Sequence, residues 1–339
     1  MAKKSFKFWL INITLTHNLQ PRDMNESTID TSGDKLQNST DLLKIIDLVS
    51  KTNPLQKKKI LAFVEKQDEE YFQFAEKLSK IIVHDFLQND EERIEAARSY
   101  NKMCMDFLKE QIRFRKTGIY RINDASIANE EVYSEPLVMR YYMVGLLISY
   151  LFWPNHYKLY QFFKNNLPSK DTKSYLEVGV GHGLFTSTML ANYPGILATL
   201  VDISETSIKT ANELLGAFNV DRSNITFVHG DYFTVALSEK YDFIIMGEVL
   251  EHVNDAYGFM RRAKELLKPN GSIYMSTAAN SPALDHVYHF HDDQEIRDLL
   301  AETGFRIESE LVLPADDIPQ ERWAEELVTL NYCALLKHS

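Results

Sequence analysis

An acid ends the first strand-like run in the second half of the chain, and three glycines follow it. Leu176–Phe185 reads Leu-Glu-Val-Gly-Val-Gly-His-Gly-Leu-Phe, which places Glu177 before Gly179, Gly181 and Gly183. Glycine lets the backbone turn with positive φ and lets a ligand approach without meeting a Cβ atom. The helix that follows offers N–H groups to an anion such as a carboxylate. The spacing is G-x-G-x-G, not the G-x-G-x-x-G of dinucleotide enzymes. Because Glu177 suits an ammonium group, the segment predicts a ligand that carries both charges.

Acids also end the next strand-like runs. Asp202 ends the second run, where an acid can accept hydrogen bonds from two ribose hydroxyls. Asp231 and Tyr232 follow the third run, where an acid can accept from an adenine amino group, and Glu248 follows the fourth. Ligands of open α/β sheets bind outside the carboxyl ends of the strands. These positions therefore predict one site for a nucleoside-containing ligand.

Histidines supply the candidates for proton transfer. His252 follows the fourth run and has an ordinary pKa that suits a general base at neutral pH; Glu248 is a second catalytic candidate. The string His286-Val-Tyr-His-Phe-His291 adds His289 between two further histidines. Such a group could ligate a metal, but no cysteine or clear carboxylate partner completes a site. We therefore expect no metal, and assign His286, His289 and His291 to the wall of a substrate pocket.

The secondary-structure elements that must position these residues change along the chain, from helices in the first half to alternating strands and helices in the second. After Pro168, short apolar runs alternate with helical stretches, which indicates βαβ units and a buried parallel sheet. The final runs, 305–311 and 327–336, have only a loop between them and predict an antiparallel pair at the sheet edge. The fold class is therefore α/β, a seven-stranded, mostly parallel Rossmann-like sheet with an antiparallel edge pair.

The first half of the chain is helical in pattern. We expect a disordered leader over residues 1–39, an all-α domain over 40–165 that starts behind a Ser39/Thr40 cap, and the sheet domain over 166–339. The helical domain is expected to supply a lid over the substrate, a homodimer interface, or both. Tyr142 is the substrate-binding candidate that it contributes, although core packing is the commoner role of such aromatic residues.

Composition limits the partners. The chain has 37 basic and 48 acidic residues and a formal net charge of −11, which disfavours DNA or RNA as a partner. Its two cysteines are far apart in sequence, which suits a reducing compartment. The apolar stretch 137–153 carries Arg140 and is at the lower limit for a membrane span. We expect a cytoplasmic protein that does not cross a membrane.

Taken together, the motifs resemble those of class I, Rossmann-like S-adenosylmethionine-dependent methyltransferases. The closest resemblance is to the small-molecule branch that includes the ubiquinone-pathway O-methyltransferases. The matching strings extend over residues 174–305, and are Glu177-Val-Gly-Val-Gly-His-Gly183, Val201-Asp202, Gly230-Asp231, Glu248-Val-Leu-Glu-His252 and Leu267-Lys-Pro-Asn-Gly271.

The resemblance implies S-adenosylmethionine as the cofactor and a role for each motif residue. Glu177, the glycines and Glu248 are expected near the methionine part and Asp202 at the ribose, with Asp231 and Tyr232 bordering the adenine. The fourth strand ends in Met246-Gly-Glu instead of the Asn- or Asp-Pro-Pro-aromatic string that marks methylation of base or amide nitrogens. We therefore expect in-line methyl transfer to a small-molecule acceptor, to oxygen in preference to nitrogen or carbon.

Other activities remain open at this point. The fold also serves protein methyltransferases, for which the helical domain would be a docking surface. It also serves members that do not methylate: cofactor-binding regulatory proteins and enzymes of aminopropyl transfer or rearrangement.

Overall fold

The computed structural model describes residues 32–237 and 239–339. Its centre is a seven-stranded sheet in the order β3-β2-β1-β4-β5-β7-β6. The strands are β1 (Ser174–Val178), β2 (Leu197–Asp202), β3 (Ile225–His229), β4 (Tyr241–Gly247), β5 (Leu267–Ala279), β6 (Phe305–Pro314) and β7 (Leu330–His338). All neighbouring strands among the first five (β1, β2, β3, β4 and β5) are parallel, whereas β7 runs antiparallel to both β5 and β6. The predicted sheet, including its antiparallel edge pair, is confirmed.

Helices precede the sheet and alternate with its strands. Those before β1 are α1 (Ser32–Asn38), α2 (Thr40–Thr52), α3 (Pro54–Val64), α4 (Glu69–Lys80), the π-helix η1 (Ile81–Phe86), α5 (Asp90–Thr117), α6 (Ala125–Ala128), the π-helix η2 (Asn129–Tyr133), α7 (Pro136–Phe152) and α8 (Pro154–Asn165). Those after β1 are α9 (Leu184–Asn192), α10 (Glu205–Ala217), the 3-10 helix η3 (Leu250–His252), α11 (Ala256–Leu266), α12 (Asp293–Glu302), the 3-10 helix η4 (Gln320–Arg322) and α13 (Trp323–Glu326).

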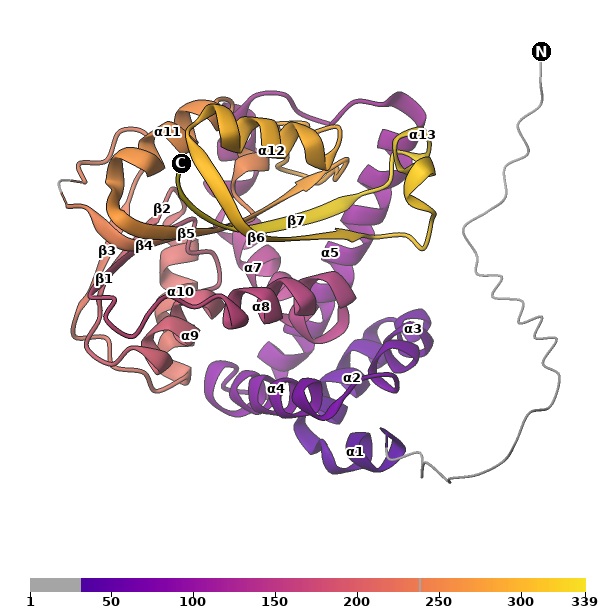
Figure 1. Ribbon diagram of the computed structural model, residues 1–339. Coiled ribbons are helices and arrows are strands. Elements are labelled where there is room, and N and C mark those ends of the chain that lie inside the picture. The colour runs from indigo at the N-terminus through magenta and orange to yellow at the C-terminus, as the bar shows by residue number, and fades with distance from the viewer. Residues whose placement is uncertain (1–31, 238) are drawn as a thin grey trace, which may run out of the picture. The chain divides into compact units, whose positions relative to one another are not determined.

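Each face of the sheet is covered by its own set of helices (Figure 1). On one face, α8, α9 and α10 share a core with the first half of the chain; on the other, α11 and α12 pack on a second core. Successive strand residues point to opposite faces, so Tyr274 belongs to the first core and Ile273 to the second. Both faces are buried, which explains the nearly continuous apolar runs of these strands.

The helices of the first half pack closely on one another. The 28-residue helix α5 packs against both α2 and α7. At the crossing with α7, a Cβ atom on Gly145 would lie 3.1 Å from Cβ of Met103, so glycine permits the close approach. Tyr71 on α4 is fully buried and donates its hydroxyl to the carbonyl of Leu151 on α7 (2.6 Å). These contacts join α2, α4, α5 and α7 into one body.

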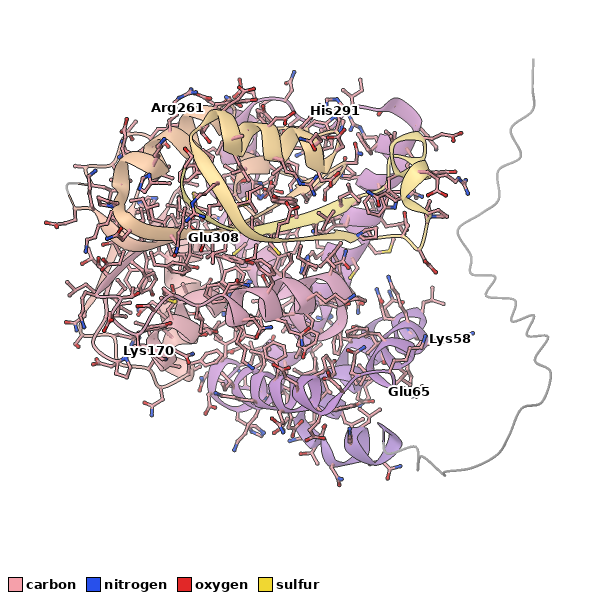
Figure 2. All side chains as sticks on the ribbon, in the orientation of Figure 1. Lys58, Glu65, Lys170, Arg261, His291 and Glu308 are labelled. Atoms are coloured by element: carbon pink, nitrogen blue, oxygen red, sulfur yellow. The ribbon has the colours of Figure 1, made fainter. Side chains whose placement is uncertain are left out.

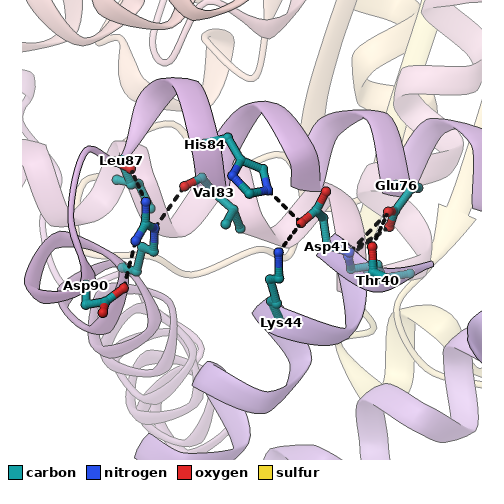
Figure 3. A network of polar contacts seen from close by, with 10 residues as sticks. Thr40, Asp41, Lys44, Glu76, Val83, His84, Leu87 and Asp90 are labelled. Atoms are coloured by element: carbon teal, nitrogen blue, oxygen red, sulfur yellow. Dashed lines mark hydrogen bonds and ion pairs between the residues drawn. The ribbon is translucent and has the colours of Figure 1, made fainter. Parts of the chain in front are cut away.

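The start of α2 differs from the predicted Ser39/Thr40 cap. Ser39 makes no side-chain cap; instead the carboxylate of Glu76, on α4, accepts from the backbone N–H groups of Asp41 (3.1 Å) and Leu42 (3.0 Å). Figure 3 shows this contact and the neighbouring ion pairs of Asp41 with Lys44 and His84. A carboxylate here satisfies free N–H groups and stabilises the positive end of the helix.

The predicted domain limits remain predictions, and the structure shows how the chain packs on either side of them. Residues 1–31 of the predicted leader lie outside the described residues, and residues 32–38 of it form α1. The predicted boundary after residue 165 leaves α8 with the helical domain, yet Phe163 of α8 packs on Tyr274 of β5 (4.9 Å between ring centres) and on Phe185 of α9 (4.7 Å). Residues 32–339 form one compact unit.

The apolar stretch 137–153 lies in α7, except for its last residue, Trp153, which directly follows the helix. Within the described ranges, no single helix is long and apolar enough to cross a membrane, and α7 and α8 reach that length only as a pair bent by 85°.

Candidate cofactor and acceptor site

The glycine turn joins β1 to α9 at the carboxyl edge of the sheet. Gly179 and Gly181 have positive φ values of 73° and 53°, a conformation that costs other residues free energy. A Cβ atom on Gly179 would lie 2.8 Å from Cγ2 of Val249, so the strand-end loops approach each other closely there. The N–H of Gly181 donates to Oδ2 of Asp202 (3.1 Å). The turn therefore brings the ends of β1, β2 and β4 together, as predicted.

Gly183 is packed against a different element from the other two glycines. Its φ is 85° and it precedes α9, but a Cβ atom there would meet Cα and Cβ of Ala211 on α10 at 3.1 Å. Gly183 thus permits close packing of α9 against α10. Its predicted contact with a cofactor remains a prediction.

Glu177 and Asp202 place two buried acids beside this turn. Glu177 is 2% exposed and accepts from the hydroxyl of Thr186 on α9. Burial raises the pKa of Glu177 to about 8, and the negative charge of Asp202 adds to the shift. Burial likewise raises the pKa of Asp202 to about 6, although the N–H groups of Ser204 and Gly181 donate to its carboxylate. The two acids repel each other, so a cation bound near them would lower the free energy of the ionised pair.

The end of β3 presents one exposed acid and one buried ring. Asp231 is exposed, and its Oδ1 accepts from the N–H of Phe233 (2.9 Å). The ring of Tyr232 is buried against Phe259 on α11, 4.4 Å between ring centres. Phe233 and Ile203 are the apolar side chains exposed at these strand ends, at 36% and 41%. Sequence reasoning missed both, although each directly follows a predicted site residue.

Glu248 follows β4 in an unusual conformation. Its φ of 53° is rare for a residue with a side chain, and such strain is often found at functional sites. Its backbone N–H donates to the carbonyl of Ser276 on β5 (3.0 Å). Burial and the neighbouring Glu251 hold the pKa of Glu248 well above its ordinary value. Oε1 of Glu248 is buried without a hydrogen-bond partner in the described chain.

Next to these strand ends lies a group of titratable side chains, which we call the His252 cluster; it consists of Tyr133, Tyr142, Glu251, His252, Asp285 and His286. Asp285, 2% exposed, lies at its centre. It accepts from the hydroxyls of Tyr142 at Oδ1 and Tyr133 at Oδ2, both at 3.2 Å. Nδ1 of His252 lies 3.1 Å from the Asp285 carbonyl oxygen and 3.4 Å from Oδ2. Asp285 thus fixes a histidine and two tyrosines from distant parts of the chain.

The two histidines of the cluster lie ring to ring. Their centroids are 4.7 Å apart with the planes at 89°, and Nδ1 of His286 lies 2.5 Å from the carbonyl oxygen of Ser281. Burial lowers the pKa of His252, but Asp285 and Glu251 outweigh it, so the pKa lies above its ordinary value. Burial and the charge of His252 hold the pKa of His286 below its ordinary value.

Only part of the predicted pocket wall comes together. Tyr142 and His286 both belong to the His252 cluster, but His289 and His291 lie apart from it. His289 packs on Tyr120, 4.6 Å between ring centres, and bonds Asn280 through Nε2 (2.8 Å). His291 is exposed near α12 (Figure 2). It pairs with Glu295, with 3.0 Å between Nδ1 and Oε1. Their predicted substrate contacts remain predictions.

Asp285 was missed by sequence reasoning, and Glu251 was a weaker candidate for the general base than its neighbour His252. The only local signal was their position: each directly precedes a histidine that was selected. Glu251 is fully buried, and its Oε2 accepts from the hydroxyl of Thr277 on β5 (2.7 Å).

Comparison with known proteins gives a match to one domain model and several relatives that align with only part of this chain. Residues 153–310 match a family model described as a methyltransferase domain. The malonyl-[acyl-carrier protein] O-methyltransferase 1 of Ilyobacter polytropus is 32% identical over 112 residues, 33% of this chain and 40% of that protein. The ubiquinone biosynthesis O-methyltransferase of Pasteurella multocida is 34% identical over 113 residues, 31% of this chain and 46% of that protein. The chain thus matches less than half the length of either relative.

Solved structures resemble the chain more loosely. The structure of the mitomycin 7-O-methyltransferase MmcR has a TM-score of 0.48 and 15% identity, and the match covers 91% of this chain and 97% of that one.

Proposed function

We propose that the chain transfers a methyl group from S-adenosylmethionine to an oxygen atom of a small molecule, because residues 153–310 match the methyltransferase domain model. The match to the methyltransferase domain model supports the enzyme class and the cofactor. Oxygen as the accepting atom and the small size of the acceptor are our proposal. The printed names of the two relatives above, both O-methyltransferases, support oxygen.

The residues at the glycine turn fit the cofactor. S-adenosylmethionine supplies an electrophilic methyl group on a positively charged sulfur. Glu177 and Asp202 are buried acids that repel each other, so a cationic ligand beside them is favoured. Asp202 would hold the ribose hydroxyls, and the backbone of Gly179 and Gly181 leaves room for the methionine part.

The observation that carries the proposal is the position of the His252 cluster. Ser204, two residues after Asp202, donates its hydroxyl to the carbonyl of Tyr133 (3.0 Å), so the cluster begins where the predicted ribose site ends. Within the cluster, Asp285 orients His252. An acceptor hydroxyl bound here could lose its proton next to the cofactor.

The chain's own contribution is alignment and proton removal. Alignment of two bound reactants can lower a barrier by roughly 7–11 kcal/mol, and a positioned base adds about 10²–10⁴-fold. His252 activates the acceptor hydroxyl in this proposal, and its predicted role as the general base is one way in which it could do so. Tyr133 and Tyr142 close the cluster from the helical part and help to select the acceptor.

The test compares matched oxygen and nitrogen acceptors. The full chain and S-adenosylmethionine are incubated with pairs that differ only in the accepting atom, such as a phenol and the matching aniline. S-adenosylhomocysteine formation is measured, and mass spectrometry locates the methyl group. We expect methylation of oxygen; products methylated only on nitrogen or carbon would contradict the proposal. His252→Gln should reduce turnover about 100-fold or more, whereas His84→Gln, which alters a histidine that pairs with Asp41 and is not part of the cluster, should leave it unchanged.

A further inference from the structure

Helix α7, from the first half of the chain, lies against the glycine turn between β1 and α9. A Cβ atom on Gly181 would lie 3.6 Å from Sδ of Met143. Tyr150 follows Met143 by seven residues, so it lies on the same side of α7, and its ring packs on His182 of the turn with 5.4 Å between ring centres. We propose that Tyr150 and His182 bind the carboxylate of the cofactor's methionine part, an inference that rests on the proposed function.

Tyr150 brings a buried hydroxyl group to this turn. The side chain is 5% exposed, and its ring also packs on Phe185, with 6.2 Å between ring centres, and on His156, with 5.4 Å. The hydroxyl forms no hydrogen bond within the described ranges, and a buried hydroxyl without a partner is unfavourable. Burial raises the pKa of Tyr150, and the charges of Glu248 and Glu177 add to the shift. The hydroxyl therefore lies near the ends of β4 and β1, where the methionine part is expected.

His182 offers a second donor, which is also uncharged. The residue is 8% exposed, and its Nδ1 accepts from the backbone N–H of Leu184 (3.3 Å). The proton of the neutral ring therefore lies on Nε2. Burial and the neighbouring His156 lower the pKa of His182 to about 3, so the ring stays neutral near neutral pH. No hydrogen bond of Nε2 occurs in the part of the chain that the structure describes, which leaves this N–H for a ligand.

The surroundings of the turn explain why a carboxylate needs these two side chains. The sequence assigns an anion to the N–H groups at the start of α9, but the N–H of Leu184 already bonds to His182, and Gly183 is packed on α10. Among the described residues, no lysine or arginine contributes to the pKa shifts of Glu177, Tyr150 and His182. The two uncharged donors therefore supply the hydrogen bonds to the carboxylate, while Glu177 receives the ammonium group.

The pair makes recognition of the cofactor depend on the first half of the chain. Tyr150 belongs to α7 (Pro136–Phe152), which ends before residues 153–310, the match to the methyltransferase domain model. Hydrogen bonds to a charged group contribute more than hydrogen bonds between neutral groups. The pair should therefore favour ligands that carry a carboxylate over ligands that carry the ammonium group alone. S-adenosylhomocysteine and its decarboxylated form differ only in this carboxylate.

Calorimetric titration of the full chain with these two ligands tests the proposal. We expect the wild type to bind S-adenosylhomocysteine at least about tenfold more tightly than the decarboxylated form. Tyr150→Phe should weaken S-adenosylhomocysteine binding about tenfold or more, and it should leave the affinity for the decarboxylated form within about twofold. Tyr160→Phe is the matched control, because the Tyr160 hydroxyl bonds to Thr188 (3.1 Å) and its ring packs on Tyr150. This control should change neither affinity.

A second variant keeps the outcome unambiguous. His182→Asn retains an acceptor for the N–H of Leu184 but is too short to replace Nε2–H. It should show the same selective loss, and it tests the proposal even if Tyr150→Phe fails to fold. Variants that weaken both ligands equally, or that bind both like the wild type, overturn the carboxylate assignment. A wild type that binds both ligands equally overturns this inference alone, whereas a wild type that binds neither contradicts the proposed function itself.

Discussion

Asp202 is held in place by the backbone before any ligand binds. Its two carboxylate oxygens accept from the N–H groups of Gly181 (3.1 Å) and Ser204 (2.8 Å). These bonds fix the side chain at the carboxyl end of β2. A ribose that binds there meets an acceptor that needs little reorganisation.

We predict that Asp202→Asn weakens S-adenosylhomocysteine binding about 10- to 100-fold, because a hydrogen bond to a charged group contributes roughly 1.5–3 kcal/mol. Calorimetry measures the loss. Asp221→Asn is the matched control, since Asp221 also accepts from a backbone N–H, that of Ser223, but is exposed in the loop before β3. An affinity for Asp202→Asn within twofold of the wild type would refute the ribose assignment.

Glu177 should make stability depend on pH. Its folded-state pKa of about 8 lies above the ordinary value of 4.5, so its contribution to stability is fully present below about pH 4.5 and is lost as pH rises through 8. This loss amounts to at most about 1.4 kcal/mol per pH unit. Glu177→Gln has no such loss and can still accept from Thr186. We therefore expect the free energy of unfolding of the variant, relative to the wild type, to increase from pH 5 to pH 8.

Urea unfolding at pH 5, 6.5 and 8, without cofactor, measures this difference. A difference that stays constant over the three pH values would show that Glu177 does not titrate as described.

The sequence indicated some residues of the candidate site and not others, for a physical reason. Glu177 and Asp202 were predictable because they end strands, and strand ends converge at one edge of a parallel sheet. The His252 cluster was not, because its contacts join residues far apart in the chain: 152 positions separate Tyr133 from Asp285. No local pattern encodes such a contact.

At the level of elements, local rules predicted the sheet better than the helix ends. The alternation of apolar runs and helical stretches gave every strand, because both faces of the sheet are buried. The start of α2 was predicted from Ser39 and Thr40, but Glu76 of α4 satisfies its N–H groups. That partner is known only once α4 has packed beside α2.

Gly183 and Gly195 illustrate two separate reasons why a position requires glycine: a positive φ and a lack of space for a Cβ atom. Both have φ near 80°, but a Cβ atom at Gly183 would meet Ala211 at 3.1 Å, whereas at Gly195 it would meet nothing within 4 Å. Gly195→Ala should cost about 1–2 kcal/mol from the backbone conformation alone. Gly183→Ala should cost roughly a further 1–3 kcal/mol, because it overpacks the contact between α9 and α10.

Chemical denaturation of the two variants measures both costs. Equal destabilisation would show that α9 and α10 can move apart freely, in contradiction to the packing described.

At the scale of the whole molecule, the helical half and the sheet build the candidate site together. Tyr133 and Tyr142 come from η2 and α7, and they bond to Asp285 in the loop after β5. Arg121 donates to the carbonyl of Leu284, beside that aspartate (2.6 Å). In our proposal the motifs of the sheet bind the cofactor, whereas the first half of the chain helps to select the acceptor.

The packing of α8 predicts where the chain can be divided. Phe163 of α8 is fully buried on Tyr274 and Phe185, and each large apolar side chain that is exposed costs about 1.5–3 kcal/mol. We expect a fragment of residues 166–339 to lack a cooperative unfolding transition, and a fragment of 153–339, which keeps α8, to be the more stable. Thermal unfolding monitored by circular dichroism compares them. Equal cooperativity would contradict the assignment of α8 to the sheet.

The central claim is that the carboxyl edge of the sheet binds S-adenosylmethionine. Calorimetric titration of S-adenosylmethionine and S-adenosylhomocysteine into the full, folded chain tests it most directly. The account predicts saturable binding of both, with one molecule per chain, and clear weakening by Asp202→Asn. A folded protein that produces no binding signal with either ligand would contradict it.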